Sequence, residues 1–292
     1  MKKGRFSTVI LILIFFAGLS LLLYPTVSDS WNSLHQSRAI TEYAEQVAEL
    51  DVHRYEQLWA EAESYNKSLL QKENRFHMSD EEKKEYQNLL DISGSGVIGY
   101  IEIPAIDCSL PIYHGTDEAV LQIAVGHIEG TSLPTGGETT HCVISGHRGL
   151  PSARLFTDLD KMKEGDVFSL HVLDRILTYE TDQILTVEPD ETEALAIEPG
   201  KDYCTLVTCT PYGINSHRLL VRGHRIATPV SEEDTEEVQI PPTDYTFFVM
   251  AAVMGMILLL AVLLIIWKKR QKRKQKAQEE RRTDRHRRKT RR

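Results

Sequence analysis

The sequence lacks the short motifs that mark a metal enzyme. Its 292 residues contain no Cys-x-x-Cys pair and no His-Glu-x-x-His run, although eleven histidines are present. No acidic stretch resembles an EF-hand loop, which leaves Ca²⁺ binding by the acidic loops as an alternative to a solvated acidic surface. We therefore expect no metal site and no cofactor.

Positive charge is scarce over most of the chain. Residues 268–292 hold 15 Lys and Arg with three acidic residues, and residues 2–5 hold three more basic ones. Once both segments are removed from the totals of 34 basic and 42 acidic residues, 16 basic and 39 acidic residues remain over 6–267. This segregation indicates that parts of the chain lie in different environments.

Two long apolar runs separate these charges. Ser7–Tyr24 follows the basic N-terminus, and Tyr245–Trp267 is about as long as a bilayer crossing. Because basic residues flank both runs on their outer ends, we expect two transmembrane helices, with both termini in the cytoplasm and the middle of the chain outside. The first run can instead be a cleaved signal peptide. A basic tail beside a span indicates binding to membrane lipids, not to nucleic acid.

Apolar spacing of three and four residues predicts helices over residues 30–70, with a break near Asp51. Ser79 or Asp80 is placed to cap a further short helix that runs to Leu90. After Gly94–Gly96 the pattern changes to short strands. The many short strands predict a closed β-barrel. We expect a short helix at 118–125 and strands at 97–103, 109–113, 142–145, 167–173, 176–180, 184–187, 203–208 and 218–226.

Cys209 lies where the strand at 203–208 ends, and Arg218 begins the return strand. If the two strands pair, a guanidinium lies beside a thiol, which favours the thiolate and can stabilise an oxyanion. Alternation puts Arg222 on the same face as Arg218, and Arg225 is a further candidate for this role. Cys204 lies at an odd spacing from Cys209 and cannot readily bridge to it.

The remaining cysteines and histidines have simpler interpretations. Cys142 and Cys204 sit in apolar strands and are expected to be buried, while Cys108 is left unassigned. Most histidines outside the motif described next are expected to be surface or structural residues.

Two motifs carry a family resemblance. Thr205–Cys209 (Thr-Leu-Val-Thr-Cys) resembles the TLxTC signature of sortases, and the residues after it, to Val221, resemble the pilin-polymerising class C. Ser145–Gly149 (Ser-Gly-His-Arg-Gly) is similar to the segment around the family's catalytic histidine. The resemblance covers roughly residues 91–226 and implies an eight-stranded barrel, so the expected fold is an all-β closed barrel with N-terminal helices, flanked by two transmembrane helices.

The resemblance also implies a mechanism and a set of residues. Sortases cut an LPxTG-like sorting signal through a thioester, and class C enzymes pass the acyl group to a Lys of the next pilin. It implies Cys209 as nucleophile, His147 as general acid and then base, and Arg218 as oxyanion stabiliser. Thr208 and Ser145 are expected to contact the substrate.

Class C sortases usually carry a lid over the active site before the barrel, anchored by an Asp-Pro-aromatic or similar motif. This sequence has no Asp-Pro over residues 71–90, where Phe76 and Met78 are the candidates to occupy the cleft.

We therefore predict a two-pass cell-membrane enzyme, a cysteine transpeptidase of pilus assembly whose catalytic domain is extracellular. Its partners are pilins or surface proteins with an LPxTG-like signal. The alternatives are a housekeeping sortase that anchors proteins to peptidoglycan, a cysteine hydrolase, and a non-catalytic membrane-anchored surface protein. The predicted segments are a cytoplasmic N-terminus at 1–6, a transmembrane or signal-anchor segment at 7–27, N-terminal helices with the lid at 28–91, the catalytic barrel at 92–228, a linker at 229–244, a transmembrane helix at 245–267 and a basic tail at 268–292.

Overall fold

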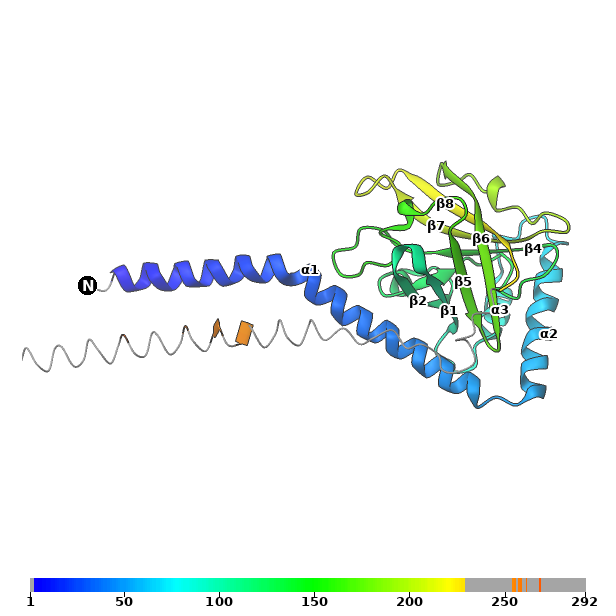
Figure 1. Ribbon diagram of the computed structural model, residues 1–292, viewed down its shortest axis with the longest axis horizontal. Coiled ribbons are helices and arrows are strands. Elements are labelled where there is room, and N and C mark those ends of the chain that lie inside the picture. The colour runs from blue at the N-terminus through cyan, green and yellow to red at the C-terminus, as the bar shows by residue number, and fades with distance from the viewer. Residues whose placement is uncertain (1–2, 229–253, 256, 259–260, 262–267, 269–292) are drawn as a thin grey trace, which may run out of the picture. The chain divides into compact units, whose positions relative to one another are not determined.

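The computed structural model describes the fold of residues 3–228 and six residues beyond them, at 254–255, 257–258, 261 and 268 (Figure 1). Side chains are described from residue 14 onward. Everything below concerns these residues.

Eight strands form a closed barrel, as the sequence predicted. Neighbouring strands follow the order β1-β2-β3-β4-β7-β8-β6-β5, and β5 pairs with β1 to close the ring. Most neighbours are antiparallel, but β2 with β3 and β4 with β7 run parallel. The strands are β1 Val97–Ile103, β2 Cys108–His114, β3 Val125–His127, β4 Thr140–Ser145, β5 Val167–Val172, β6 Arg175–Val187, β7 Asp202–Thr210 and β8 His217–Arg225.

The structure differs from the prediction at strands β3 and β6. The helix expected at 118–125 is shorter, with α4 at Glu118–Leu121, and its predicted end instead begins strand β3. Strand β3 has only three residues, too few for an alternating pattern to be visible. The strands expected at 176–180 and 184–187 are one strand, β6, whose pairing with β8 shifts between Thr181 and Gln183. This bulge interrupts the alternation of apolar and polar residues along β6, so the sequence pattern predicts two strands where there is one.

The barrel interior is the core of the molecule. Strand β5 shows the pattern clearly: Phe168, Leu170 and Val172 are buried and alternate with half-buried neighbours. Phe168 stacks on Tyr179 of the paired strand, with ring centroids 5.6 Å apart. Because these side chains fill the interior, the strands and their ends are held in fixed positions.

Helices α1 (Lys3–Ala48) and α2 (Val52–Leu69) precede the barrel, and the break between them lies near Asp51, as predicted. Asp51 caps α2, because its carboxylate accepts a hydrogen bond from the Arg54 amide at 2.8 Å. The α1 residue Tyr43 joins the barrel: its hydroxyl donates to the Ile98 carbonyl at 3.2 Å and accepts from the Leu173 amide at 2.8 Å.

Helix α3 (Asp80–Asn88) begins at the predicted cap. The Ser79 hydroxyl accepts from the Glu82 amide, and the Glu82 carboxylate accepts from the Ser79 amide, which completes a capping box. The helix buries Tyr86, whose hydroxyl lies 2.8 Å from Nδ1 of His127 and accepts from the Gly115 amide.

In the part of the chain that the structure describes, no helix is both long enough and apolar enough to cross a membrane. The predicted first span, 7–27, falls within α1 and gains no support from this finding. The predicted linker (229–244), the second span and the basic tail lie largely outside the described residues.

Candidate active site

The hairpin of β7 and β8 sets Cys209 directly opposite Arg218. Residues opposite each other in an antiparallel pair present their side chains on the same face, with Cβ atoms roughly 4.5–5.5 Å apart. The thiol and the guanidinium therefore lie together at the end of the hairpin, where the chain turns through residues 211–216. Both side chains are half-buried, so a ligand can reach them.

His147 reaches the same place from the neighbouring strand. Strand β4 runs parallel to β7, and its last residue, Ser145, pairs with Val207. The contact continues one residue further, where the Gly146 amide donates to the Val207 carbonyl at 3.0 Å. Since His147 lies two residues past Ser145, and Cys209 lies two residues past Val207 and one before the end of β7, both residues lie at the same end of the sheet on neighbouring segments.

The backbone before His147 is held on both sides. The buried Thr208 hydroxyl donates to the Gly146 carbonyl at 2.8 Å. A Cβ on Gly146 would come within 2.7 Å of the Phe156 ring and 2.8 Å of Val125, so no side chain fits there. The small residue in the Ser-Gly-His run thus permits the close packing that brings His147 to the end of β7.

Within residues 3–228, neither the Cys209 thiol nor the His147 ring has a hydrogen-bond or ion-pair partner. The Arg218 guanidinium contacts only its own turn, where Nη1 donates to the carbonyls of His217 at 3.1 Å and Asn215 at 3.4 Å. All three side chains are therefore available to a substrate.

Arg222 and Arg225, the alternatives to Arg218 as the cation beside Cys209, make contacts elsewhere. Arg222 forms a forked ion pair with Asp182, with Nε at 2.9 Å and Nη2 at 3.1 Å from its two oxygens. Its guanidinium also stacks over Tyr203 at 4.2 Å. The Arg225 guanidinium lies 5.6 Å over the Tyr179 ring. Only Arg218 pairs with Cys209.

A pocket of about 420 Å³ is lined by Arg218, although neither Cys209 nor His147 is among its lining residues. Ser145, Val207 and Arg218 form part of its wall, while Thr208 is buried and does not line it. The lining combines the Arg218 cation, the carboxylates of Glu129 and Glu191 and several apolar side chains, and the pocket is large enough for part of an extended peptide. The other lining residues are Phe76, Thr116, Ile128, Glu129, Val187, Pro189, Glu191, Thr192, Leu195 and Leu220.

The segment between α2 and α3 enters this pocket through Phe76, whereas Met78 packs against the main core. Arg75 holds Phe76 in place: its guanidinium lies 4.6 Å over the ring, and Nη2 donates to the Leu195 carbonyl at 2.6 Å. Gly130 allows the close approach, because a Cβ there would lie 2.1 Å from the Arg75 carbonyl. The sequence had offered Phe76 and Met78 equally and had given no role to Arg75. The only signal in the sequence for the Arg75–Phe76 contact is that the two residues are adjacent, because an arginine beside a phenylalanine can stack on its ring.

Other buried titratable residues lie outside this site. Burial lowers the pKa of His114 and that of His141 to about 4 each. The His141 ring lies 2.7 Å from the Thr205 hydroxyl and 2.8 Å from the Ala196 carbonyl. Cys142 and Cys204 are buried, as predicted, and all four cysteines are free. Among the described residues, no group of three or more His, Cys, Asp or Glu side chains is placed to hold a metal ion.

Comparisons with known proteins agree with this geometry. A family model described as the sortase domain matches residues 101–226. Sortase C1 from Streptococcus agalactiae is 51% identical with a TM-score of 0.63, over 65% of this chain and 99% of that one. Sortase C from Clostridium perfringens, solved with the C-terminal cell wall sorting motif, is 46% identical with a TM-score of 0.58, over 65% and 99%. Sortase A from Bacillus anthracis is 25% identical over 228 residues, which are 78% of this chain and 98% of that one.

The motifs that carried the resemblance lie in the matched region. Thr205–Cys209 lies in the last part of strand β7, which ends at Thr210, and Ser145–Gly149 begins at the end of strand β4. Since a solved relative at 51% identity is matched over nearly its whole length, the chain belongs to the sortase family of cysteine transpeptidases, in its class C branch.

Proposed function

We propose that this chain polymerises pilins outside the cell. It cleaves an LPxTG-like sorting signal between Thr and Gly and joins the new carboxyl end to a Lys side chain of the next subunit. The observation that carries this proposal is the pairing of Cys209 with Arg218, with His147 two residues past the end of the adjacent strand β4. Sortase C of Streptococcus pneumoniae, 51% identical, supports it, because its structure is described as giving insight into pilin substrate specificity.

In the first half-reaction the Cys209 thiolate attacks the carbonyl carbon of the signal's Thr. The carbon–nitrogen bond to Gly breaks, and His147 gives its proton to the departing amine. Arg218 stabilises the oxyanion formed in between, because it is a permanent cation with directional donors. The acyl group is then held on Cys209 as a thioester, which conserves the energy of the broken peptide bond.

In the second half-reaction a Lys amine of the next pilin attacks the thioester. His147 accepts the proton that the amine loses, the carbon–sulfur bond breaks, and Cys209 leaves as the thiolate. The product is an isopeptide bond, and the enzyme returns to its starting protonation state. Attack by water instead of the amine would give a hydrolase, so the acceptor decides the outcome.

Ser145 and Thr208 support this chemistry in different ways. Ser145 lines the pocket and is placed to contact the sorting signal. Thr208 is buried, and its hydroxyl is used by the Gly146 carbonyl, so we assign it to the shape of the site beneath the substrate.

We also propose that the enzyme is a two-pass cell-membrane protein with its catalytic barrel outside. The support lies in the sequence, where apolar runs at 7–24 and 245–267 carry basic residues on their outer ends. An enzyme held at the membrane would meet pilins as they are exported.

The test is polymerisation that depends on Cys209. The full-length chain is incubated with purified pilin from the same organism, and the products are followed on denaturing gels and by mass. A ladder of Lys-linked pilin, absent with the Cys209→Ala variant, is expected. Cleavage of the signal without a ladder would favour a hydrolase or an enzyme that attaches proteins to peptidoglycan. No cleavage with matched enzyme and pilin would contradict the proposal.

A further inference from the structure

The relative position of His147 and Cys209 needs an explanation beyond the strands that carry them. The pairing of β4 with β7 ends at Ser145 and Val207, and the last backbone hydrogen bond between the two segments is made by the Gly146 amide, one residue before His147. In many cysteine and serine enzymes a third side chain orients the histidine. Here, within residues 3–228, the His147 ring has no such partner. Cys209 is still held in β7 by its pairing with β8, and the Thr208 hydroxyl fixes the chain up to Gly146. What needs a further contact is the loop that carries His147 beyond Gly146.

Arg148, the residue after His147, makes that contact. Its Nη1 donates to the Thr210 hydroxyl at 3.4 Å, and its guanidinium lies 5.8 Å over the ring of Tyr212. Thr210 follows Cys209 and is the last residue of β7, and Tyr212 lies two residues beyond it. Gly149 adds to the contact, because a Cβ there would lie 2.8 Å from the Tyr212 ring. The segment after His147 therefore packs on the segment after Cys209.

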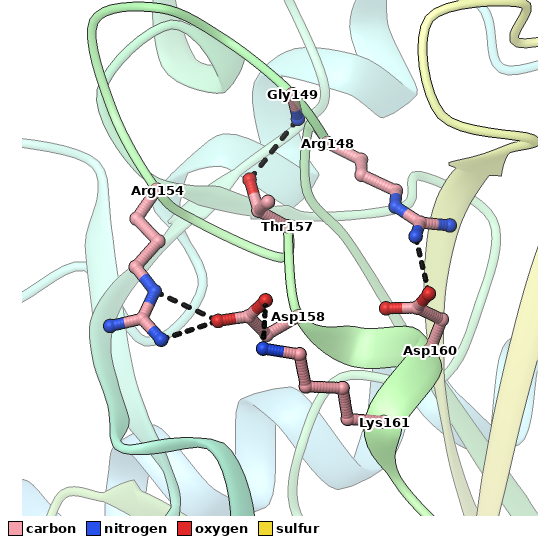
Figure 2. A network of polar contacts seen from close by, with 7 residues as sticks. All are labelled: Arg148, Gly149, Arg154, Thr157, Asp158, Asp160 and Lys161. Carbon is pink, nitrogen blue, oxygen red and sulfur yellow. Dashed lines mark hydrogen bonds and ion pairs between the residues drawn. The ribbon is translucent and has the colours of Figure 1, made fainter. Parts of the chain in front are cut away.

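The other side of Arg148 is held by Asp160, which lies on the short 3-10 helix Leu159–Lys161 (Figure 2). The Nη2 to Oδ2 distance is 2.5 Å, and the Arg148 side chain is only 9% exposed. Two hydrogen bonds close the same loop onto its start: the Phe156 amide donates to the His147 carbonyl, and the Gly149 amide donates to the Thr157 hydroxyl, each at 3.1 Å.

We propose that Arg148, fixed by Asp160, is a positioning residue that ties the loop carrying His147 to the end of β7 and so sets the imidazole beside the Cys209 thiol. This inference rests on the catalytic roles proposed above for Cys209 and His147. It adds a residue that does not touch the substrate but determines the geometry of the two that do.

Stability alone does not account for this arrangement. The Arg148 guanidinium is largely removed from water while Asp160 is 44% exposed, and desolvating a cation in an ion pair is often no better for stability than packing apolar side chains of similar size. In addition, Nε of Arg148 is buried with no hydrogen-bond partner in the described part of the chain, which costs stability. A costly cation at the junction of the two catalytic segments is better explained by the geometry it imposes.

Figure 2 also supplies a matched control. Arg154 lies on the same loop and pairs with Asp158, two residues from Asp160, in a forked contact whose Nε to Oδ2 distance is 2.9 Å. Arg154 is 55% exposed and has no contact with β7 among the described residues. Arg148→Met and Arg154→Met therefore each remove one arginine ion pair from one loop, and only the first cuts the tie to Cys209.

The first measurement is steady-state cleavage of a Leu-Pro-x-Thr-Gly peptide by the full-length chain. A catalytic group misplaced by about 1 Å can cost on the order of 100-fold, so for Arg148→Met we expect kcat to fall about 30- to 100-fold with KM within about twofold. Asp160→Asn is expected to lie between Arg148→Met and the wild type. Arg154→Met and Asp158→Asn should stay within about twofold of wild type, and thermal melting should confirm that each variant is folded.

The second measurement uses no peptide and so does not depend on the proposed sorting signal. The rate at which iodoacetamide alkylates Cys209 is followed against pH, with the Cys209→Ala variant as the blank. The profile of Arg148→Met should move to that of His147→Ala, while Arg154→Met should keep the wild-type profile. Wild-type kcat and profile in Arg148→Met, or equal losses in Arg154→Met, would overturn the proposal. A wild type that alkylates as expected but cleaves no peptide would instead count against the proposed function.

Discussion

Phe76 is the side chain whose removal should raise the activity of this enzyme. It lies in the pocket with Ser145 and Arg218, and it packs in an apolar cluster with Leu195 and Val207. A sorting signal that uses this pocket must displace it. The Phe76→Ala variant should therefore bind and cleave a free peptide better than the wild type does.

The magnitude follows from the contacts that hold the ring. Burying a whole Phe side chain is worth roughly 1.5–3 kcal/mol, so a half-buried ring contributes about 1 kcal/mol. The stacking of Arg75 on the ring adds about 0.5–1 kcal/mol. Losing both shifts the closed-to-open equilibrium by about 1.5–2 kcal/mol, or roughly 10- to 30-fold. If the closed state predominates, kcat/KM rises by the same factor.

The assay is cleavage of a quenched fluorescent Leu-Pro-x-Thr-Gly peptide by the full-length chain. Met78→Ala is the control, because Met78 lies on the same segment but packs against the main core. It should leave kcat/KM within about twofold of the wild type. A Phe76→Ala variant that cleaves no faster than the wild type, or a Met78→Ala variant that gains as much, would refute this account of the pocket.

Three further predictions concern catalysis and stability. Arg218→Lys keeps the charge but loses the directional fork, so kcat should fall about 10²- to 10³-fold with the protein still folded; a fall of less than threefold would contradict an oxyanion role. His114 and His141 have pKa values of about 4 in the folded protein against about 6.5 unfolded, so the unfolded state takes up protons first and stability is lost as pH falls from 6.5 to 4. Urea unfolding at pH 7.5 and pH 5 should differ by about 2 kcal/mol for each histidine, and His141→Gln should roughly halve the difference; an unchanged difference would be inconsistent with this cause. Ser79→Ala removes half of the capping box of α3 and should lower the free energy of unfolding by about 1 kcal/mol, whereas an unchanged urea midpoint would show that the cap is dispensable.

Local signals in the sequence predicted much of the fold. Strand β1 runs from Val97 to Ile103, as its apolar run indicated; the helices break near Asp51, as predicted, and Ser79, one of the two predicted cap residues, caps α3. The prediction was wrong where the local pattern was short or interrupted. Strand β3 has three residues, and the bulge near Thr181 divided the pattern of β6. Pairing with neighbouring strands decides such cases, and pairing is not visible in a local pattern.

For the same reason, the sequence predicted the candidate catalytic residues but not the residues that hold them in place. Cys209, His147 and Arg218 stand in motifs, and strand pairing brings their segments together. The contacts of Arg75 with Leu195 and of Arg148 with Asp160 join segments far apart in the chain, or on opposite sides of a loop, and no motif marks them. Alternation also left Arg222 equal to Arg218. The family motif favoured Arg218, and the structure agrees, because Arg218 lies opposite Cys209 while Arg222 lies opposite Thr205 and pairs with Asp182.

The most direct test of the account is the mass of the enzyme during turnover. The full-length chain is mixed with a Leu-Pro-x-Thr-Gly peptide without an acceptor amine, quenched in acid within seconds, and analysed intact and after digestion. We predict an added mass equal to the peptide up to its Thr, carried by Cys209, removed by hydroxylamine and absent from Cys209→Ala. Peptide cleavage that proceeds equally in wild type and Cys209→Ala, or an adduct on any other residue, would contradict it.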